Sequence, residues 1–258
     1  MTTPQNPNVL GRAVRQVRRV IQPWVPRTGL RPADDHQTEG RFLREMVFGA
    51  NDGLVSNVAL VAGIAGGTDD PKIILLAGIA GIVAGAISMS LGAYASSKSE
   101  HEFRDAEERR ERWEVENMRD AELQETRHIF RLKGITGPLL DEVVEAVSRD
   151  HEQWIKLMMV EELGFPNEPP RPKVAAAVMG IAFAIAAVFP VAPYIVTEGT
   201  SALVGSVALT AVALFGVGAL RATLTSGSML RKGGEMVALG GIAVMAANLI
   251  GRLVGVTV

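Results

Sequence analysis

The chain has 258 residues, of which 48% are hydrophobic, and a formal net charge of −2 at pH 7. This near balance of charge gives no reason to expect nucleic-acid binding. The absence of cysteine excludes disulfides, thiolate metal sites and cysteine catalysis. Charged residues gather in the first 40 residues and between Lys98 and Lys173, while the other segments are nearly uncharged.

The first 40 residues are rich in Pro, Arg and Gln and contain no long apolar run. A cleaved secretory signal needs such a run, so we do not expect one here. We expect residues 1–40 to form a basic, mobile N-terminal arm. An alternative for residues 9–25 is an amphipathic helix on an anionic membrane surface.

Five apolar runs follow, each long enough for a membrane span. A bilayer core about 30 Å thick needs about 20 apolar residues in a helix. The runs cover residues 46–66, 73–97, about 174–197, 201–220 and 237–258. The predicted fold class is therefore all-α, an integral membrane protein with five transmembrane helices and a cytosolic three-helix insert between spans two and three. We expect four parts: the arm (1–40), spans one and two (41–97), a cytosolic helical metal-binding domain (98–171) and spans three to five (172–258).

The basic residues of the loops predict the orientation. Lys and Arg are enriched in cytosolic loops, and here they occur in the N-terminal arm, the insert, and the loop with Arg221, Arg231 and Lys232. These segments all fall on one side if the N-terminus is cytosolic. Five spans then leave the C-terminus outside, and the Ala- and Arg-rich composition suggests a bacterial cytoplasmic membrane.

One carboxylate interrupts the first span. Asp52 is the only charged side chain between Glu45 and Asp69. A charge in hydrocarbon is costly and is kept where it lines a cavity or meets a partner, so we expect Asp52 to lie on a pathway for a cation or a proton. The alternative is a position near the interface, where the carboxylate caps or solvates the start of the helix. In the second span, the soft thioether of Met89 could contact a passing metal, although membrane methionines usually serve packing.

The insert carries repeated carboxylates on predicted helices. Residues 99–119 contain no Gly or Pro, so the second span should continue as a long helix, followed by helices over about 120–133 and 138–164. Acids three residues apart share a helical face, and mixed carboxylates and thioethers suit a first-row divalent metal. The residues in this pattern are Glu111, Glu114, Glu122, Glu125, Met158, Met159 and Glu162. The alternative is a solvated helix whose acids pair with arginines 109, 110 and 112.

A further pattern is Glu125-x-x-His128, which is half of the di-iron signature of ferritin-like bundles. No other histidine stands three residues after a glutamate, so the second half is missing. This weakens an oxidase interpretation.

Three blocks in this order resemble the vacuolar iron transporter family, including its bacterial members. They are Phe-Gly-Ala-Asn-Asp-Gly-Leu-Val-Ser-Asn at 48–57, Ala-Gly-Ala-Ile-Ser-Met at 84–89 and Met-Met-Val-Glu-Glu-Leu-Gly at 158–164. The resemblance covers nearly the whole chain from about Arg41. It implies a dimeric five-span antiporter, not an enzyme, that exchanges cytosolic Fe²⁺ for protons through a pore between the two subunits.

The resemblance also implies roles for residues. Asp52 would handle metal and proton in the membrane, with Met89 beside it and Glu45 at the cytosolic pore entrance. Metal would be collected by Glu111, Glu114, Glu122, Glu125, Met158, Met159 and Glu162. No cofactor is expected to be permanently bound; Fe²⁺, or Mn²⁺, Co²⁺ or Zn²⁺, is the expected substrate, and the partners are a second copy, the bilayer and protons.

The sequence departs from the family pattern at one position. Members usually carry Gly-Glu-Tyr after the second-span methionine block, whereas this chain has Gly92-Ala93-Tyr94. Two other functions stay open: a membrane-tethered iron-oxidising enzyme centred on Glu125 and His128, and a metal sensor or scaffold that binds metal without transport.

Overall fold

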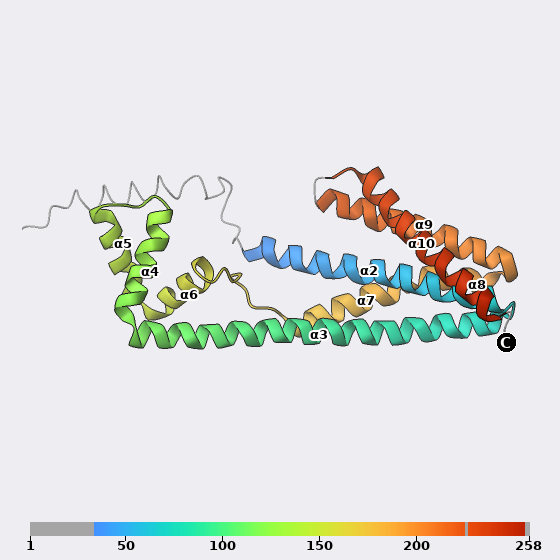
Figure 1. The fold of residues 1–258 in the computed structure, drawn as a ribbon, viewed down its shortest axis with the longest axis horizontal. Helices are drawn as coiled ribbons and strands as arrows, with labels where there is room; N and C mark the ends of the chain where they lie inside the picture. The colour runs from blue at the N-terminus through green and yellow to red at the C-terminus, as the bar shows by residue number, and fades with distance from the viewer. Residues whose placement is uncertain (1–33, 225–226, 256–258) are drawn as a thin grey trace, which may run out of the picture. The chain divides into compact units, whose positions relative to one another are not determined.

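The computed structural model describes residues 34–224 and 227–255, and every regular element in those ranges is a helix. Most of the predicted N-terminal arm, residues 1–33, lies outside the described residues. The helices, labelled as in Figure 1, are α2 (Asp34–Gly67), α3 (Pro71–Asn117), α4 (Arg119–Leu132), α5 (Pro138–Ser148), α6 (His151–Glu161), α7 (Pro172–Val191), α8 (Pro193–Val196), α9 (Gly199–Leu224) and α10 (Met229–Gly255).

Five of these helices are long and apolar enough to cross a membrane. They contain the segments Gly40–Gly67, Pro71–Asn117, Pro172–Val191, Gly199–Ala222 and Met229–Gly255. The prediction of an all-α protein with five spans is thereby confirmed. The first helix begins twelve residues before the predicted run at Met46, because the polar residues ahead of that run continue the same helix.

The helix α3 has 47 residues and joins an apolar half to a charged half without a break. This continuation was predicted from the absence of Gly and Pro after Ser99, residues that would interrupt intrahelical hydrogen bonds or add backbone freedom. The helix ends at Asn117, whose side chain amide donates a hydrogen bond to the carbonyl of Trp113.

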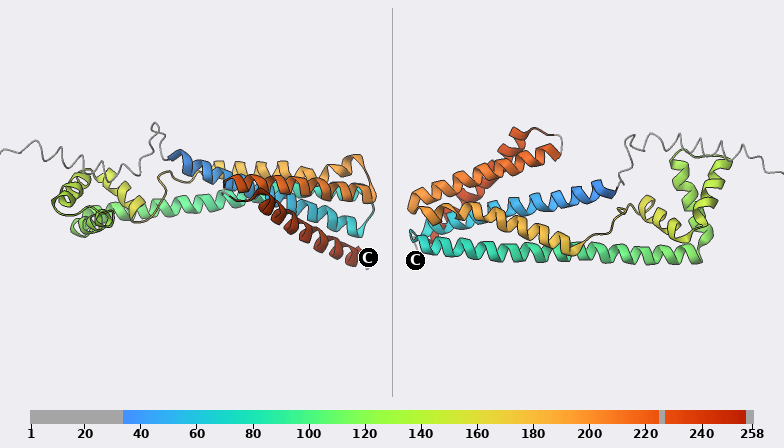
Figure 2. Two further views of the ribbon diagram at one scale, coloured as in Figure 1. Left: turned by 90° about the horizontal axis from the view of Figure 1, so that it is seen from above. Right: turned by 180° about the vertical axis from the view of Figure 1, so that it is seen from behind.

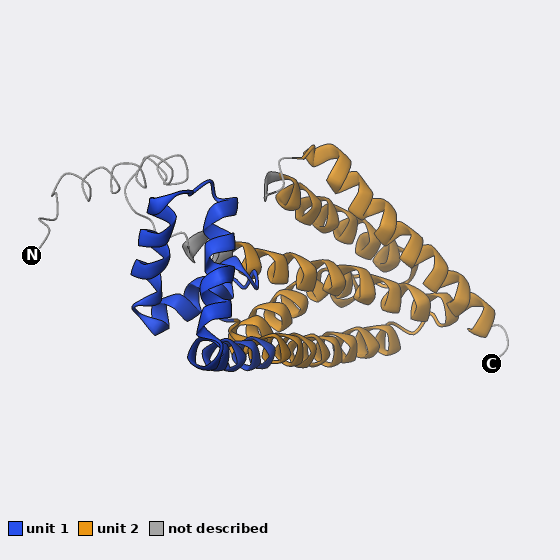
Figure 3. Cartoon of the chain, turned by 60° about the vertical axis from the view of Figure 1, so that its left-hand side comes forward, with its two compact units in different colours: residues 1–37, 102–169 blue, residues 38–101, 170–258 orange. Residues whose placement is uncertain are grey.

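Two compact units divide the chain (Figure 3): one contains Glu102–Pro169, the other Thr38–His101 and Pro170–Val258. The core of the first unit forms where α3, α4 and α6 meet. Its fully or almost fully buried side chains are Val115, Trp154, Ile155, Met158 and Met159.

The third helix expected in the insert, over 138–164, is in fact two helices, α5 and α6. The break falls at Asp150, whose extended backbone and side chain cap the N-terminus of α6. The Asp150 carboxylate accepts hydrogen bonds from the backbone N–H groups of Glu152 and Gln153 at 3.1 and 3.2 Å. Such a cap stabilises a new helix start and competes with continuation of the preceding helix.

The second unit is held together by close helix contacts at small residues. A Cβ atom added to Gly251 on α10 would collide with the carbonyl oxygen of Gly63 on α2, so the two backbones touch there. Small residues at such crossings allow membrane helices to gain packing contacts. The helices α9 and α10 also run side by side in both views of Figure 2.

A buried amide links three helices of this unit. Asn57 on α2 is 2% exposed, and its Nδ2 donates to the carbonyl of Ala187 on α7 at 2.8 Å and to that of Gly78 on α3 at 3.4 Å. Inside a membrane bundle, such hydrogen bonds satisfy groups that water cannot reach. The same contacts fix α2, the helix that carries Asp52.

Candidate metal site and membrane carboxylate

Three carboxylates from separate segments of the first unit converge. Glu111 lies on α3, Glu122 on α4, and Glu162 directly after α6. One carboxylate oxygen of each lies within 4.8 Å of the others. Glu111 and Glu122 are 3% and 4% exposed, and Glu162 is exposed, so the cluster is open to solvent on one side only.

Burial, followed by the proximity of the other acids, raises the pKa values of these three glutamates. Burial, followed by the charges of Glu122 and Glu162, raises the pKa of Glu111 to about 8. Burial and the charges of Glu125 and Glu122 raise the pKa of Glu162 to about 7. The pKa of Glu122 is also raised, by burial first and then by Glu125. Without a cation, the cluster therefore holds protons at neutral pH.

Two further predicted acids border the cluster. Glu114 accepts a hydrogen bond from Arg110 Nε at 3.1 Å, four residues away on the same helix. After burial, the charge of Glu125 is the next cause that raises the pKa values of Glu122 and Glu162. Together with the central three residues, these acids make up all five glutamates that were predicted as metal ligands in the insert, and Glu114 and Glu125 both raise pKa values within the cluster.

The arginines do not neutralise the centre of the cluster. Arg110 pairs with Glu114, and Arg112 pairs with Glu108 and Glu152. In the described part of the chain, Glu111, Glu122 and Glu162 form no ion pair with Lys or Arg, and Glu111 Oε1 and Glu122 Oε2 are buried without a hydrogen-bond partner. Buried polar atoms are normally satisfied, and a divalent cation would satisfy these two. The pure solvated-helix alternative does not explain the buried oxygens.

The two predicted thioether ligands lie in the apolar core of the same unit. Met158 and Met159 are 0% and 2% exposed. The Met158 sulfur is 3.6 Å from the hydroxyl of Thr126, which itself donates to the backbone carbonyl of Glu122 at 2.7 Å. Met158 therefore contacts Thr126 on α4, the helix that also carries Glu122. Metal ligation by Met158 or Met159 stays a prediction.

Asp52 lies on a different surface, in the middle of α2. It is half-buried, while Phe48 and Ser56, four residues to either side on the same helical face, are exposed. The Ser56 hydroxyl donates to the backbone carbonyl of Asp52 at 2.6 Å, which leaves the carboxylate available. The stripe of Phe48, Asp52 and Ser56 therefore faces outward from a single copy of the chain. Met89 on α3 is also half-buried.

Glu45 lines a cavity of about 200 Å³ near one end of α2. The other acid in this cavity is Glu100, and the bases are Arg41 and Arg44. Arg41 Nη2 lies 3.7 Å from Glu100 Oε1. The cavity is also lined by Ala93, the position at which the sequence departs from the family pattern.

Comparisons with known proteins agree with the pattern of motifs. Residues 43–252 match the model of the VIT family. The chain belongs to the VIT family. Its relatives include vacuolar iron transporter 1 of Arabidopsis thaliana, 34% identical over 223 residues that cover 86% of this chain and 89% of the relative. Vacuolar iron transporter 1 of Eucalyptus grandis is 34% identical over 82% of this chain and 86% of its own length, and the vacuolar iron transporter of Plasmodium falciparum is 29% identical over 84% of each.

The prediction from the sequence that this chain is a vacuolar iron transporter family member is thus confirmed. Its bacterial origin stays a prediction. The half di-iron motif of Glu125 and His128 lies on α4 with both residues exposed. His128 is not among the three residues that converge with their ligand atoms.

The sequence reasoning missed the residues that support the cluster of this VIT-family protein. Trp154 donates from Nε1 to the Thr126 hydroxyl at 2.8 Å, and the guanidinium of Arg119 lies 5.1 Å from the centre of the Trp154 ring. Thr126 stands four residues after Glu122, and Trp154 four before Met158. Residues four apart share a helical face, so this spacing could have predicted that Thr126 and Trp154 lie beside the predicted ligands.

Proposed function

We propose that this chain exports a divalent transition metal, with Fe²⁺ as the main candidate, from the cytosol in exchange for protons. The observation that carries the proposal is the convergence of Glu111, Glu122 and Glu162 without a neutralising base, in a multi-pass membrane protein. The names of the relatives support iron as the substrate.

Metal capture would take place at the carboxylate cluster on the cytosolic side. Carboxylate oxygens suit hard and intermediate divalent ions, and nearby thioethers from Met158 and Met159 would favour first-row metals over Ca²⁺ or Mg²⁺. Binding would replace the protons that these acids hold, because metal and protons compete for the same oxygens. The cluster thereby raises the local metal concentration and removes part of the hydration shell.

Passage through the membrane would use Glu45, Asp52 and Met89. Glu45 would receive the ion at the cytosolic entrance, and Asp52 and Met89 would bind it deeper in the membrane. Protonation of Asp52 from the acidic far side would lower its affinity and release the metal. The proton would then leave towards the cytosol, which completes the exchange.

A second copy of the chain would complete this pathway. Asp52 belongs to an outward-facing stripe of one copy, and an ionised carboxylate facing acyl chains is costly. Two such stripes facing each other across a two-fold axis would enclose a polar passage. We therefore propose a homodimer with its pore at the subunit interface.

Metal uptake into proteoliposomes with an acidic interior tests the proposal. Fe²⁺, Mn²⁺, Co²⁺ and Zn²⁺ are compared, with Asp52→Asn as the transport variant. Asp69→Asn is the matched control, since Asp69 is exposed in the turn between α2 and α3. Asp52→Asn should reduce uptake to the level of empty liposomes, and Asp69→Asn should transport like the wild type.

Full transport by Asp52→Asn would overturn the mechanism. Metal binding without uptake by the wild type would instead favour a sensor or scaffold. Oxygen consumption with Fe²⁺ that depends on His128 would favour an oxidising enzyme, because transport requires no oxygen.

A further inference from the structure

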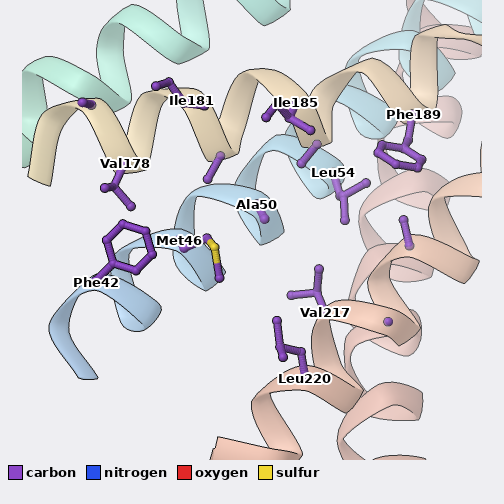
Figure 4. Close-up of a pocket in the computed structure, with 15 residues that line it drawn as sticks. Phe42, Met46, Ala50, Leu54, Val178, Ile181, Ile185, Phe189, Val217 and Leu220 are labelled. Atoms are coloured by element: carbon purple, nitrogen blue, oxygen red, sulfur yellow. The ribbon is translucent and has the colours of Figure 1, made fainter. Parts of the chain in front are cut away.

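A long apolar groove lies between α2, α7 and α9 in the membrane-spanning unit (Figure 4). Its volume is about 640 Å³, and all fifteen residues that line it are apolar. Phe42 and Leu54 mark its two ends on α2, and Leu220 lies at its α9 side. At Gly216 on α9 the wall carries no side chain, and an added Cβ would meet nothing within 4 Å.

The length of the groove matches one leaflet of a bilayer. Phe42 and Leu54 are twelve residues apart, which corresponds to about 18 Å of α-helix at 1.5 Å per residue. Half of a hydrocarbon core about 30 Å thick is about 15 Å. The groove therefore has the length and the chemistry of a site for one acyl chain.

The groove is separate from the proposed transport pathway. Ala50 and Leu54, which line it, are each two residues from Asp52. Two residues correspond to about 200° around an α-helix. The groove thus lies on the face of α2 opposite Asp52, where an ion or proton would find no ligand.

One end of the groove is basic. Arg44 and Arg221 line a neighbouring cavity of about 620 Å³ between α2, α9 and α10. Arg221 directly follows Leu220 of the groove, whereas Arg44, two residues after Phe42, lies on another face of α2. Arg44 also borders the smaller cavity with Glu45. Basic pockets between membrane helices bind anionic lipid head groups, and the guanidinium fork matches phosphate geometry.

We propose that this groove binds one acyl chain of an anionic glycerophospholipid whose phosphate contacts Arg221. The proposal is independent of metal transport, since it uses neither Asp52 nor the carboxylate cluster.

Native mass spectrometry of the purified full chain tests the proposal with dioleoyl phosphatidylglycerol and dioleoyl phosphatidylcholine as probes. Gly216→Leu fills the groove, and Gly241→Leu is the matched control, because a Cβ at Gly241 on α10 also meets open space. The wild type and Gly241→Leu should retain phosphatidylglycerol about tenfold more tightly than Gly216→Leu. Ala177→Leu, at an exposed position in the groove wall, provides a second filled variant if Gly216→Leu does not fold.

The head-group contact is tested by the variant Arg221→Gln. It should bind phosphatidylglycerol no better than phosphatidylcholine, whereas the wild type should prefer phosphatidylglycerol. The proposal is overturned if the filled variants bind phosphatidylglycerol like the wild type, or if the wild type shows no preference between the two lipids. It is also overturned if Gly216→Cys, in a chain with no other cysteine, cross-links two copies through the groove.

Discussion

Replacing the buried carboxyl of Glu111 by an amide should stabilise the metal-free protein while weakening its metal site. The pKa of Glu111 is raised to about 8 by burial and by the charges of Glu122 and Glu162. The unfolded chain has the ordinary value of 4.5. Between these two values the folded protein holds a proton that the unfolded chain has released. The stability contributed by Glu111 is therefore complete below pH 4.5 and is lost as the pH rises towards about 8.

The magnitude at pH 7 follows from the same values. The folded carboxyl is still protonated at pH 7, about 2.5 pH units above the pKa of the unfolded chain, and each unit corresponds to about 1.4 kcal/mol. Because Glu111 must take up a proton when the chain folds at pH 7, this carboxyl lowers the free energy of unfolding by up to about 3 kcal/mol. The amide of Glu111→Gln carries no such cost. For a domain of this size, that gain corresponds to a rise in Tm of several degrees.

Thermal unfolding of the detergent-solubilised chain with a chelator measures this effect. Tryptophan fluorescence is a suitable signal, because Trp154 is fully buried in the same unit. Glu116→Gln, at an exposed position on the same helix, is the matched control and should leave Tm unchanged. A Tm for Glu111→Gln at pH 7 equal to or below that of the wild type would refute the reasoning, as would a wild-type Tm that does not fall between pH 5.5 and 8.

Three further predictions concern the same two units. Glu122→Gln should weaken Co²⁺ binding by about tenfold or more in calorimetric titrations, whereas Glu116→Gln should bind like the wild type. Wild-type Co²⁺ affinity should rise from pH 6 to pH 8 as protons leave acids such as Glu162, whose pKa is about 7; equal affinity at both pH values would argue against carboxylate ligands. Asn57→Leu should lower the stability of the membrane unit by about 1–2 kcal/mol, because the carbonyl of Ala187 loses its hydrogen bond; an unchanged unfolding midpoint would contradict this.

The five spans could be predicted because a bilayer imposes a minimum length on every apolar helix. The long continuation of α3 could also be predicted, since nothing after Ser99 interrupts it before Asn117. The division between α5 and α6 was missed, although Asp150 followed by Gln153 has the spacing of a capping box. That local signal was overlooked within a run of good helix formers.

Only part of the candidate metal site could be predicted from the sequence. Helical spacing predicted that Glu111 and Glu114 share a face, as do Glu122 and Glu125, but spacing within one helix says nothing about which helices meet. The convergence with Glu162 depends on contacts far apart in the sequence, and only the family resemblance indicated it. The buried hydrogen bond between Trp154 and Thr126 depends on tertiary packing in the same way.

The cavity beside Glu45 gives the departure at Ala93 an electrostatic meaning. Two acids and two arginines line that cavity, so its formal charges cancel, and Ala93 contributes only a methyl group to the wall. A glutamate at this position, as in the usual family pattern, would make the same space anionic. A change at this one position would then alter how strongly that cavity attracts cations, while the carboxylates elsewhere in the chain stay the same.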